Sequence, residues 1–301
     1  MGTPDFAVAS LQALVEHGYN VVAVITAPDK PAGRGMQLKG SAVKEYALRQ
    51  GLPVLQPDKL KNEAFLETLR AYAADVQIVV AFRMLPEVVW DMPAMGTVNV
   101  HASLLPQYRG AAPINWAIIN GETETGVTTF RLKHEIDTGN ILLQDKLAIL
   151  PEDNIGHVYE KLMQKGAALL LTTVDGLVAG SISEQPQPAS AAELRHAPKI
   201  FKEDCQIDWN KPVESLHNLV RGLSPYPAAF TTMDDKQLKI FQTTFEPAET
   251  GKAPGSYDTD GKSYLRFAAA DGWLNCIDIQ YEGKKRMPVA DFLRGFRARQ
   301  A

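Results

Sequence analysis

Two polar residues stand at the end of an apolar, β-branched run. The segment at 97–110 reads TVNVHASLLPQYRG, so Asn99 and His101 lie two residues apart and face the same side of a strand. An Asn amide can donate a hydrogen bond to a developing oxyanion, and a His can move a proton or stabilise that oxyanion when charged. The pair therefore suits acyl transfer.

Such a pair still needs a carboxylate to orient the His ring, and Asp137 is the candidate. It follows the β-rich run 126–132 and stands in the turn-forming stretch HEIDTGNIL. A buried Asp beside His101 would hold the ring and fix its tautomer. The residues alone leave a structural reading open, because an isolated NxH pair is more often structural and DTG is a common turn.

Most other kinds of catalytic site lack their motifs. The chain contains no GxSxG, no HExxH, no P-loop, and no GxGxxG after a strand. Its remaining histidines are scattered, and no Cys/His cluster suggests a metal. We therefore expect no metal, and direct transfer from a bound acyl donor to an incoming nucleophile.

The pattern of apolar residues predicts how these groups are positioned. Helices are expected at 5–17, 41–50, 62–74, 113–120, 154–180 and 213–221, and strands at 21–26, 76–82, 97–101 and 126–132. This alternation is typical of an α/β, Rossmann-like domain with a mostly parallel sheet. Ligands bind beyond the carboxyl ends of such strands, which is where 97–101 ends.

The composition changes beyond the long helix. We predict a catalytic domain at 1–188, a polar, proline-bearing linker at 189–203, and a C-terminal domain at 204–301 whose short strands suit a small β-barrel. A doubly wound sheet normally opens on a strand, yet this chain starts directly on Gly2 and Pro4. We therefore expect a further apolar strand upstream of Met1.

Bulk properties narrow the class of protein. The net charge of −4 means that any contact with nucleic acid must come from local basic patches. The two cysteines form no CxxC, the N-terminus lacks a signal peptide, and no run approaches the roughly 18 apolar residues of a membrane span. We expect a cytoplasmic protein with reduced thiols, no membrane partner and a monomeric state.

Several motifs, in order along the chain, resemble one family. They are MGTPDFA, TAPDKPAGRG, GLPVLQP, VVAF followed by LP, NVHASLLPQYRGAAPINWAI, GVTTF, IDTG and GKKRM. The chain is similar to the methionyl-tRNA formyltransferases, within the folate-dependent formyltransferases. The HxSLLPxxRGAxP segment points to the folate-dependent group, and PDKPAGRG with the β-rich C-terminal domain points to the tRNA-acting branch. Arg83 departs from the family, which often has Tyr-Gly there.

The resemblance implies a fold, a reaction and site residues. It implies a Rossmann-like formyltransferase domain followed by an OB-like barrel, and transfer of the formyl group of 10-formyltetrahydrofolate to the α-amino group of methionyl initiator tRNA. The catalytic residues would be Asn99, His101 and Asp137. The folate would be held by Ser103, Leu104, Leu105 and Pro106, and by the chain around Phe82, Met84 and Leu85.

The resemblance also implies basic residues that contact tRNA. These are Lys30, Arg34, Lys39 and Lys44 around the Pro/Gly loop 28–40, Arg109, and a second patch of Lys284, Lys285 and Arg286. On sequence alone, a solvated basic loop is the simpler interpretation, and the resemblance reverses that preference. Arg34 is the first choice for a contact with the acceptor stem.

Two other functions remain open at this point. A formyltransferase acting on an amino-sugar nucleotide or a ribonucleotide amine would share the NxH, SLLP and DTG chemistry, although the basic loop and the second domain argue against it. A non-catalytic RNA-binding protein on the same scaffold is disfavoured because all three candidate catalytic residues are present.

Overall fold

A computed structural model describes residues 1–32, 37–188 and 193–296 of the chain. The chain forms two compact units, each of which gathers several segments. The first comprises Met1–Gly110, Thr125–Leu147 and Tyr159–Arg195, and the second Ala111–Glu124, Ala148–Val158 and His196–Ala301. The domain boundaries predicted at 188 and 204 remain a proposal.

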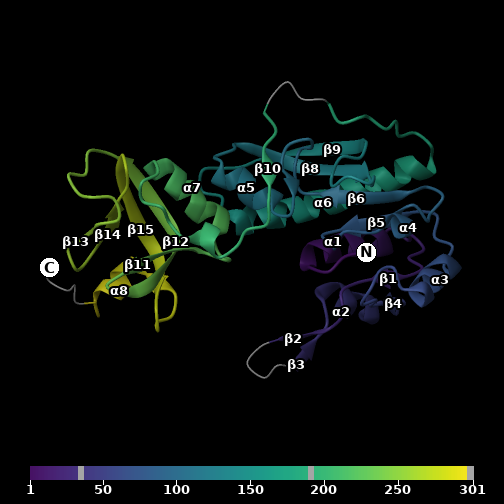
Figure 1. Cartoon of the computed structure of the whole chain (residues 1–301), viewed down its shortest axis with the longest axis horizontal. Coiled ribbons are helices and arrows are strands. Elements are labelled where there is room, and N and C mark those ends of the chain that lie inside the picture. Colours follow the sequence, from purple (N-terminus) through teal and green to yellow (C-terminus); the bar gives the residue numbers. More distant parts are fainter. Residues whose placement is uncertain (33–36, 189–192, 297–301) are drawn as a thin grey trace. The chain divides into compact units, whose positions relative to one another are not determined.

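The sheet of the first unit carries the candidate catalytic strand. Its order is β5 (Gln77–Val80), β6 (Thr97–His101), β8 (Glu124–Arg131) and β9 (Ile141–Ala148), as Figure 1 shows. β5 and β6 run parallel and pair Val79 with Asn99. β8 runs antiparallel to β6 and pairs Thr128 with His101. The parallel core confirms the predicted Rossmann-like class, and β8 adds an antiparallel neighbour.

The first two residues of the chain take a strand position. β1 (Val24–Ile25) pairs in parallel with β4 (Val54–Leu55). Gly2 N donates to Ile25 O at 3.1 Å, and Val80 N donates to Met1 O at 2.9 Å. Met1 and Gly2 therefore lie between β1 and β5, where a doubly wound sheet has a central strand.

The predicted helices of the first unit are confirmed within a few residues. They are α1 (Asp5–Glu16), α2 (Ala42–Arg49), α3 (Glu63–Ala71) and the long α6 (Ile155–Val178); a short α4 (Glu87–Trp90) and the strand β9 escaped prediction. Side-chain oxygens of Ser41 and Asn62 cap α2 and α3 by accepting from backbone N–H groups. A Cβ on Gly166 of α6 would lie 3.2 Å from Val100, so the helix backbone passes close to β6.

The predicted loop 28–40 contains a small hairpin. β2 (Lys30–Ala32) pairs antiparallel with β3 (Gln37–Lys39), so that Lys30 lies opposite Lys39. The prediction of a loop was therefore wrong at these residues. The Pro- and Gly-rich sequence does not indicate strands here, yet pairing of the two segments satisfies their backbone N–H and C=O groups. The hairpin carries both lysines on one ribbon.

The second unit is built on a curled antiparallel sheet, which confirms the predicted OB-like class. Its strands, in the order β11-β12-β15-β14-β13, are β11 (Ala229–Met233), β12 (Lys236–Pro247), β15 (Gly272–Tyr281), β14 (Leu265–Ala268) and β13 (Tyr257–Thr259), with β16 (Met287–Pro288) on β15. The register against β15 shifts between Ile240 and Thr243, and such a bulge bends a strand. The helices are α5 (Pro113–Ile119), α7 (Val213–Leu223) and α8 (Val289–Leu293).

The core of the second unit is apolar and continuous. Val220, Leu238, Ile240, Leu265 and Ile279 are fully buried in one cluster. Both cysteines are buried free thiols. In the described ranges, no helix has the length and apolar character needed to cross a bilayer.

Candidate active site

Asn99 and His101 lie at the carboxyl end of β6, as predicted. His101 is buried, and its Nε2 lies 2.9 Å from the carbonyl oxygen of Tyr108. Because a carbonyl only accepts, Nε2 must carry the hydrogen of that bond. This leaves Nδ1 as the ring nitrogen that can exchange a proton.

The structure brings Asp137 to that nitrogen. Its Oδ2 lies 3.8 Å from His101 Nδ1 and accepts a hydrogen bond from Gly110 N at 3.0 Å. The first distance allows an ion pair but exceeds a direct hydrogen bond. Asp137 has a φ of +54°, a left-handed conformation that Asp tolerates better than most residues.

Asn99 keeps its side-chain amide available. The residue is half-buried, and in the described part of the chain no hydrogen bond joins its side chain to another residue. Period-two geometry places it on the same face of β6 as His101. The three predicted catalytic residues thus gather at one end of one strand, with a donor, a proton carrier and a carboxylate.

Two residues that the sequence analysis did not single out hold the SLLP loop by hydrogen bonds. Thr128 Oγ1 donates to Ser103 O at 2.7 Å and accepts from Leu105 N at 3.2 Å. Gln144 Nε2 donates to Leu105 O and to Thr128 Oγ1, both at 2.9 Å. Thr128 stands inside the GVTTF motif, which was the available signal, whereas nothing in the sequence marked Gln144.

The predicted folate residues differ in what they expose. Ser103, Leu105 and Leu85 are buried, whereas Leu104, Pro106 and Phe82 are partly exposed and Met84 is 74% exposed. The surface that a ligand could contact here is therefore supplied by the partly or fully exposed residues of this set. Arg83 Nη1 donates to Asp58 O at 2.8 Å, which ties the loop after β5 to the loop after β4.

Arg109, predicted to contact tRNA, is engaged within the site. Its Nε donates to Gln187 Oε1 at 3.1 Å. Gln187 Nε2 in turn donates to the backbone carbonyls of Asp137 and Gly139 at 2.7 and 2.9 Å. Gln187 therefore joins the arginine to the Asp137 turn, and no motif in the sequence marked it.

The predicted tRNA-contacting residues of the hairpin separate into two groups. Lys30 and Lys39 are exposed, whereas Lys44 Nζ pairs with Asp29 Oδ2 at 2.6 Å. Gln56 Nε2 donates to Asp29 Oδ1 at 2.7 Å, and these bonds from Gln56 and Lys44 hold the pKa of Asp29 below its usual range. Lys44 therefore anchors the hairpin, while Arg34 lies outside the described residues.

The second basic patch is exposed on the turn between β15 and β16. Lys284 and Lys285 lie shortly after β15, which ends at Tyr281. Lys284 Nζ lies 5.2 Å from the centroid of the Phe292 ring. Arg286 is held by Asp278, with Nε 2.7 Å from Oδ2, and stacks over Phe241. Of the three, Arg286 is therefore the most strongly engaged within the protein.

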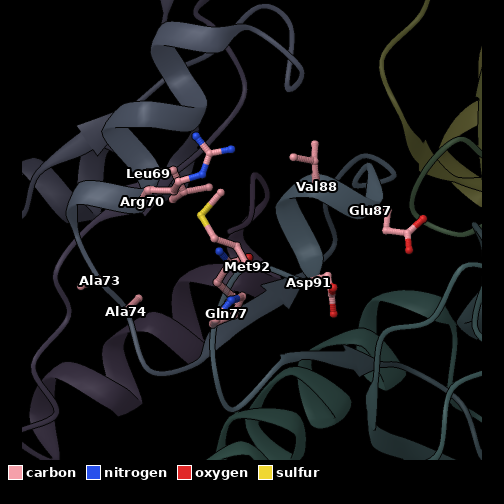
Figure 2. A pocket seen from close by; sticks show the side chains of 10 residues that line it. Leu69, Arg70, Ala73, Ala74, Gln77, Glu87, Val88, Asp91 and Met92 are labelled. Carbon is pink, nitrogen blue, oxygen red and sulfur yellow. The ribbon is translucent and has the colours of Figure 1, made fainter.

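A separate pocket lies at the opposite end of β5. Its lining comes from the end of α3, from Gln77 at the start of β5, and from α4 with the residues that follow it. Figure 2 labels Arg70, Glu87, Asp91 and Met92 among the lining residues. The candidate catalytic groups stand at the carboxyl ends of the strands instead. The pocket therefore contains no part of the candidate active site.

Comparison with known proteins matches both halves of the chain. Residues 1–174 match the family described as formyl transferase, and residues 199–297 match the formyl transferase C-terminal domain. In fold, the chain is similar to the N-formyltransferase from Helicobacter canadensis, solved with folinic acid and dTDP-3-aminofucose. The TM-score is 0.67 at 20% identity, covering 91% of this chain and 96% of that one.

Closer relatives carry a common name. The chain is 61% identical to a methionyl-tRNA formyltransferase of Parabacteroides distasonis, over 99% of this chain and 94% of the relative. It is 57% identical to that of Bacteroides fragilis, over 100% of this chain and 95% of the relative. With the Asn-His-Asp cluster at the end of β6 and this identity over its full length, the chain belongs to the methionyl-tRNA formyltransferase family.

Proposed function

We propose that this protein transfers the formyl group of 10-formyltetrahydrofolate to the α-amino group of methionyl initiator tRNA. One observation carries the chemistry: Asn99 and His101 share a face at the end of β6, with the Asp137 carboxylate 3.8 Å from His101 Nδ1. The relatives at 57% and 61% identity bear the name of this activity.

The proposed reaction needs no covalent enzyme intermediate. The methionyl amine attacks the formyl carbon, a new N–C bond forms, and the bond from that carbon to N10 of the folate breaks. The amine loses a proton and N10 gains one. Asn99 and His101 would stabilise the tetrahedral oxyanion, and Asp137 would hold the imidazole ring in place.

We propose that the folate lies along the SLLP loop and the loop after β5. Partly exposed side chains there, among them Leu104 and Phe82, offer apolar surface, while buried Ser103 and Leu105 would support the loop from within. The bonds from Thr128 and Gln144 hold this loop in one conformation, so less ordering remains to be done on binding.

The decisive test offers several amines to one enzyme. The purified protein is incubated with 10-formyltetrahydrofolate and either methionyl initiator tRNA, an amino-sugar nucleotide or a ribonucleotide amine. We expect N-formylmethionyl-tRNA, measured by release and identification of formylmethionine. Formylation of the sugar or ribonucleotide amine alone, or of none of the three, would contradict the proposal.

For the tRNA, we expect the exposed lysines of the β2–β3 hairpin to contact phosphates. Each of Lys30→Gln and Lys39→Gln should weaken tRNA binding and reduce the slope of log Kd against log salt by about 0.7–0.9 per lost phosphate contact. Arg34→Gln is predicted to behave in the same way, and folate affinity should stay unchanged in all three. Binding is measured by filter retention at several salt concentrations.

The matched control is Lys61→Gln, an exposed lysine just ahead of α3. It should leave the slope unchanged. Equal slopes for the hairpin variants and the unsubstituted protein would remove the hairpin from the tRNA interface. The predicted monomeric state and cytoplasmic location stay predictions.

A further inference from the structure

We propose that Gln187 is a positioning residue for formyl transfer, which rests on the proposed function. Its single side-chain amide holds the Asp137 turn with one end and the Arg109 guanidinium with the other. The sequence places Gln187 at the end of the predicted catalytic domain 1–188, with no motif around it. The contacts instead make it a support of the active site.

Both polar ends of the Gln187 amide, the NH2 group and the oxygen, form hydrogen bonds. Nε2 donates to Asp137 O at 2.7 Å and to Gly139 O at 2.9 Å, while Oε1 accepts from Arg109 Nε at 3.1 Å. A carboxylate could accept from the arginine but could not donate to the carbonyls. An ammonium could donate but could not accept. The Gln187 amide does both at once, with its NH2 group on the turn and its oxygen on the arginine.

The Asp137 turn needs such a support. Asp137 is in the left-handed region, which costs free energy and persists where surrounding contacts impose it. The residues just before it are exposed, and Ile136 keeps 62% of its surface, so side-chain packing contributes little there. Within the turn, Thr138 Oγ1 donates to Glu135 O at 3.1 Å. Gln187 attaches the turn to the body of the unit.

Gln187 is itself fixed by its neighbours in the chain. Ile141 N donates to Gln185 O at 2.7 Å, and Gln185 N donates to Ile141 O at 2.9 Å, which pairs the segment with the start of β9. Glu184 accepts from Asn140 Nδ2 at 3.0 Å and forms an ion pair with Arg131. The segment 184–187 thus returns to the sheet edge and presents Gln187 to the turn.

The carboxylate of Asp137 depends on this arrangement. Gly110 N donates to its Oδ2, and Gly110 directly follows Arg109, the other residue that Gln187 holds. Gln187 therefore fixes both the backbone of Asp137 and the residue next to the N–H group that orients its side chain. Losing Gln187 should displace the carboxylate from His101, and a misplacement of about 1 Å can cost about 10²-fold in rate.

The test compares two substitutions of Gln187 with a matched control. Gln187→Ala removes both sets of bonds, and Gln187→Glu keeps an acceptor for Arg109 while losing the donors to the turn. We expect kcat for formylation of methionyl-tRNA to fall about tenfold to 10²-fold in both, with the KM for the folate changed less than threefold. Gln185→Ala, an exposed glutamine two positions away, should keep wild-type kcat.

The outcomes separate this inference from the proposed function. Absence of formylation by the unsubstituted protein would contradict the function itself. With an active wild type, a kcat within twofold of it for Gln187→Glu, or a change confined to the KM for folate, would overturn the inference. Melting curves confirm that each variant is folded at the assay temperature; should Gln187→Ala be unfolded there, Gln187→Glu decides.

Discussion

Replacing His101 with Ala is expected to lower kcat for formyl transfer by about 10²-fold or more, with folding intact. Removal of one preorganised group that stabilises a developing oxyanion costs about 10²–10³-fold in other acyl-transfer enzymes. In the proposed mechanism His101 would combine that role with proton exchange at Nδ1, because its Nε2–H is bonded to Tyr108 O. The measurement is steady-state formylation at saturating folate and methionyl-tRNA.

The control for this variant is His17→Ala. His17 is an exposed histidine at the end of α1, and it should leave kcat unchanged. The substitution also removes an edge-on neighbour of Phe130, at 6.4 Å between ring centroids. Circular dichroism therefore checks that the His101 variant keeps its fold. Near-wild-type turnover by a folded His101→Ala protein would exclude the proposed chemistry at β6.

Replacing Gly139 with Ala is expected to disable the site through the backbone. A Cβ at this position would lie 1.6 Å from Arg131 O and 2.8 Å from Arg131 C, so the turn or β8 must move. Overpacking of this kind typically costs about 1–3 kcal/mol of stability. Because Asp137 is two residues away, we expect kcat to fall by about 10²-fold together with a lower melting temperature.

Gly295→Ala is the matched control, because only the flexible end of Lys284 comes within 4 Å of the added carbon. Differential scanning calorimetry and the formylation assay are run on both variants. Wild-type activity and melting temperature in Gly139→Ala would show that the turn accommodates the methyl group, and the tight approach to β8 would then have no role in placing Asp137.

Local sequence predicted correctly those features that depend on a single strand or helix. The strand 97–101 was predictable because a β-branched run has few alternatives, and period two then fixed Asn99 and His101 on one face. The long helix followed from apolar spacing in the same way. The turn at Asp137 was predictable in place, but not in its distance from His101.

The basic residues show where local reasoning fails. Lys30, Lys44 and Arg109 look alike in the sequence, yet of these three only Lys30 is exposed and forms no ion pair with another described residue. Lys44 is paired with Asp29, and Arg109 is bound by Gln187, 78 residues away. An ion-pair or hydrogen-bond partner distant in the chain cannot be read from composition or spacing.

The sequence by itself determined the chemistry on offer: an amide, an imidazole and a carboxylate in two motifs, followed by a proline-bearing loop and a second, β-rich domain. Only the tertiary structure decided how these groups are held. Thr128 on β8 and Gln144 on β9 lie far along the chain from the SLLP loop that they hold. Gln187, which follows α6, holds the Asp137 turn by hydrogen bonds. Their bonds join segments that only folding brings together, because hydrogen bonds require distances near 3 Å and not nearness in sequence.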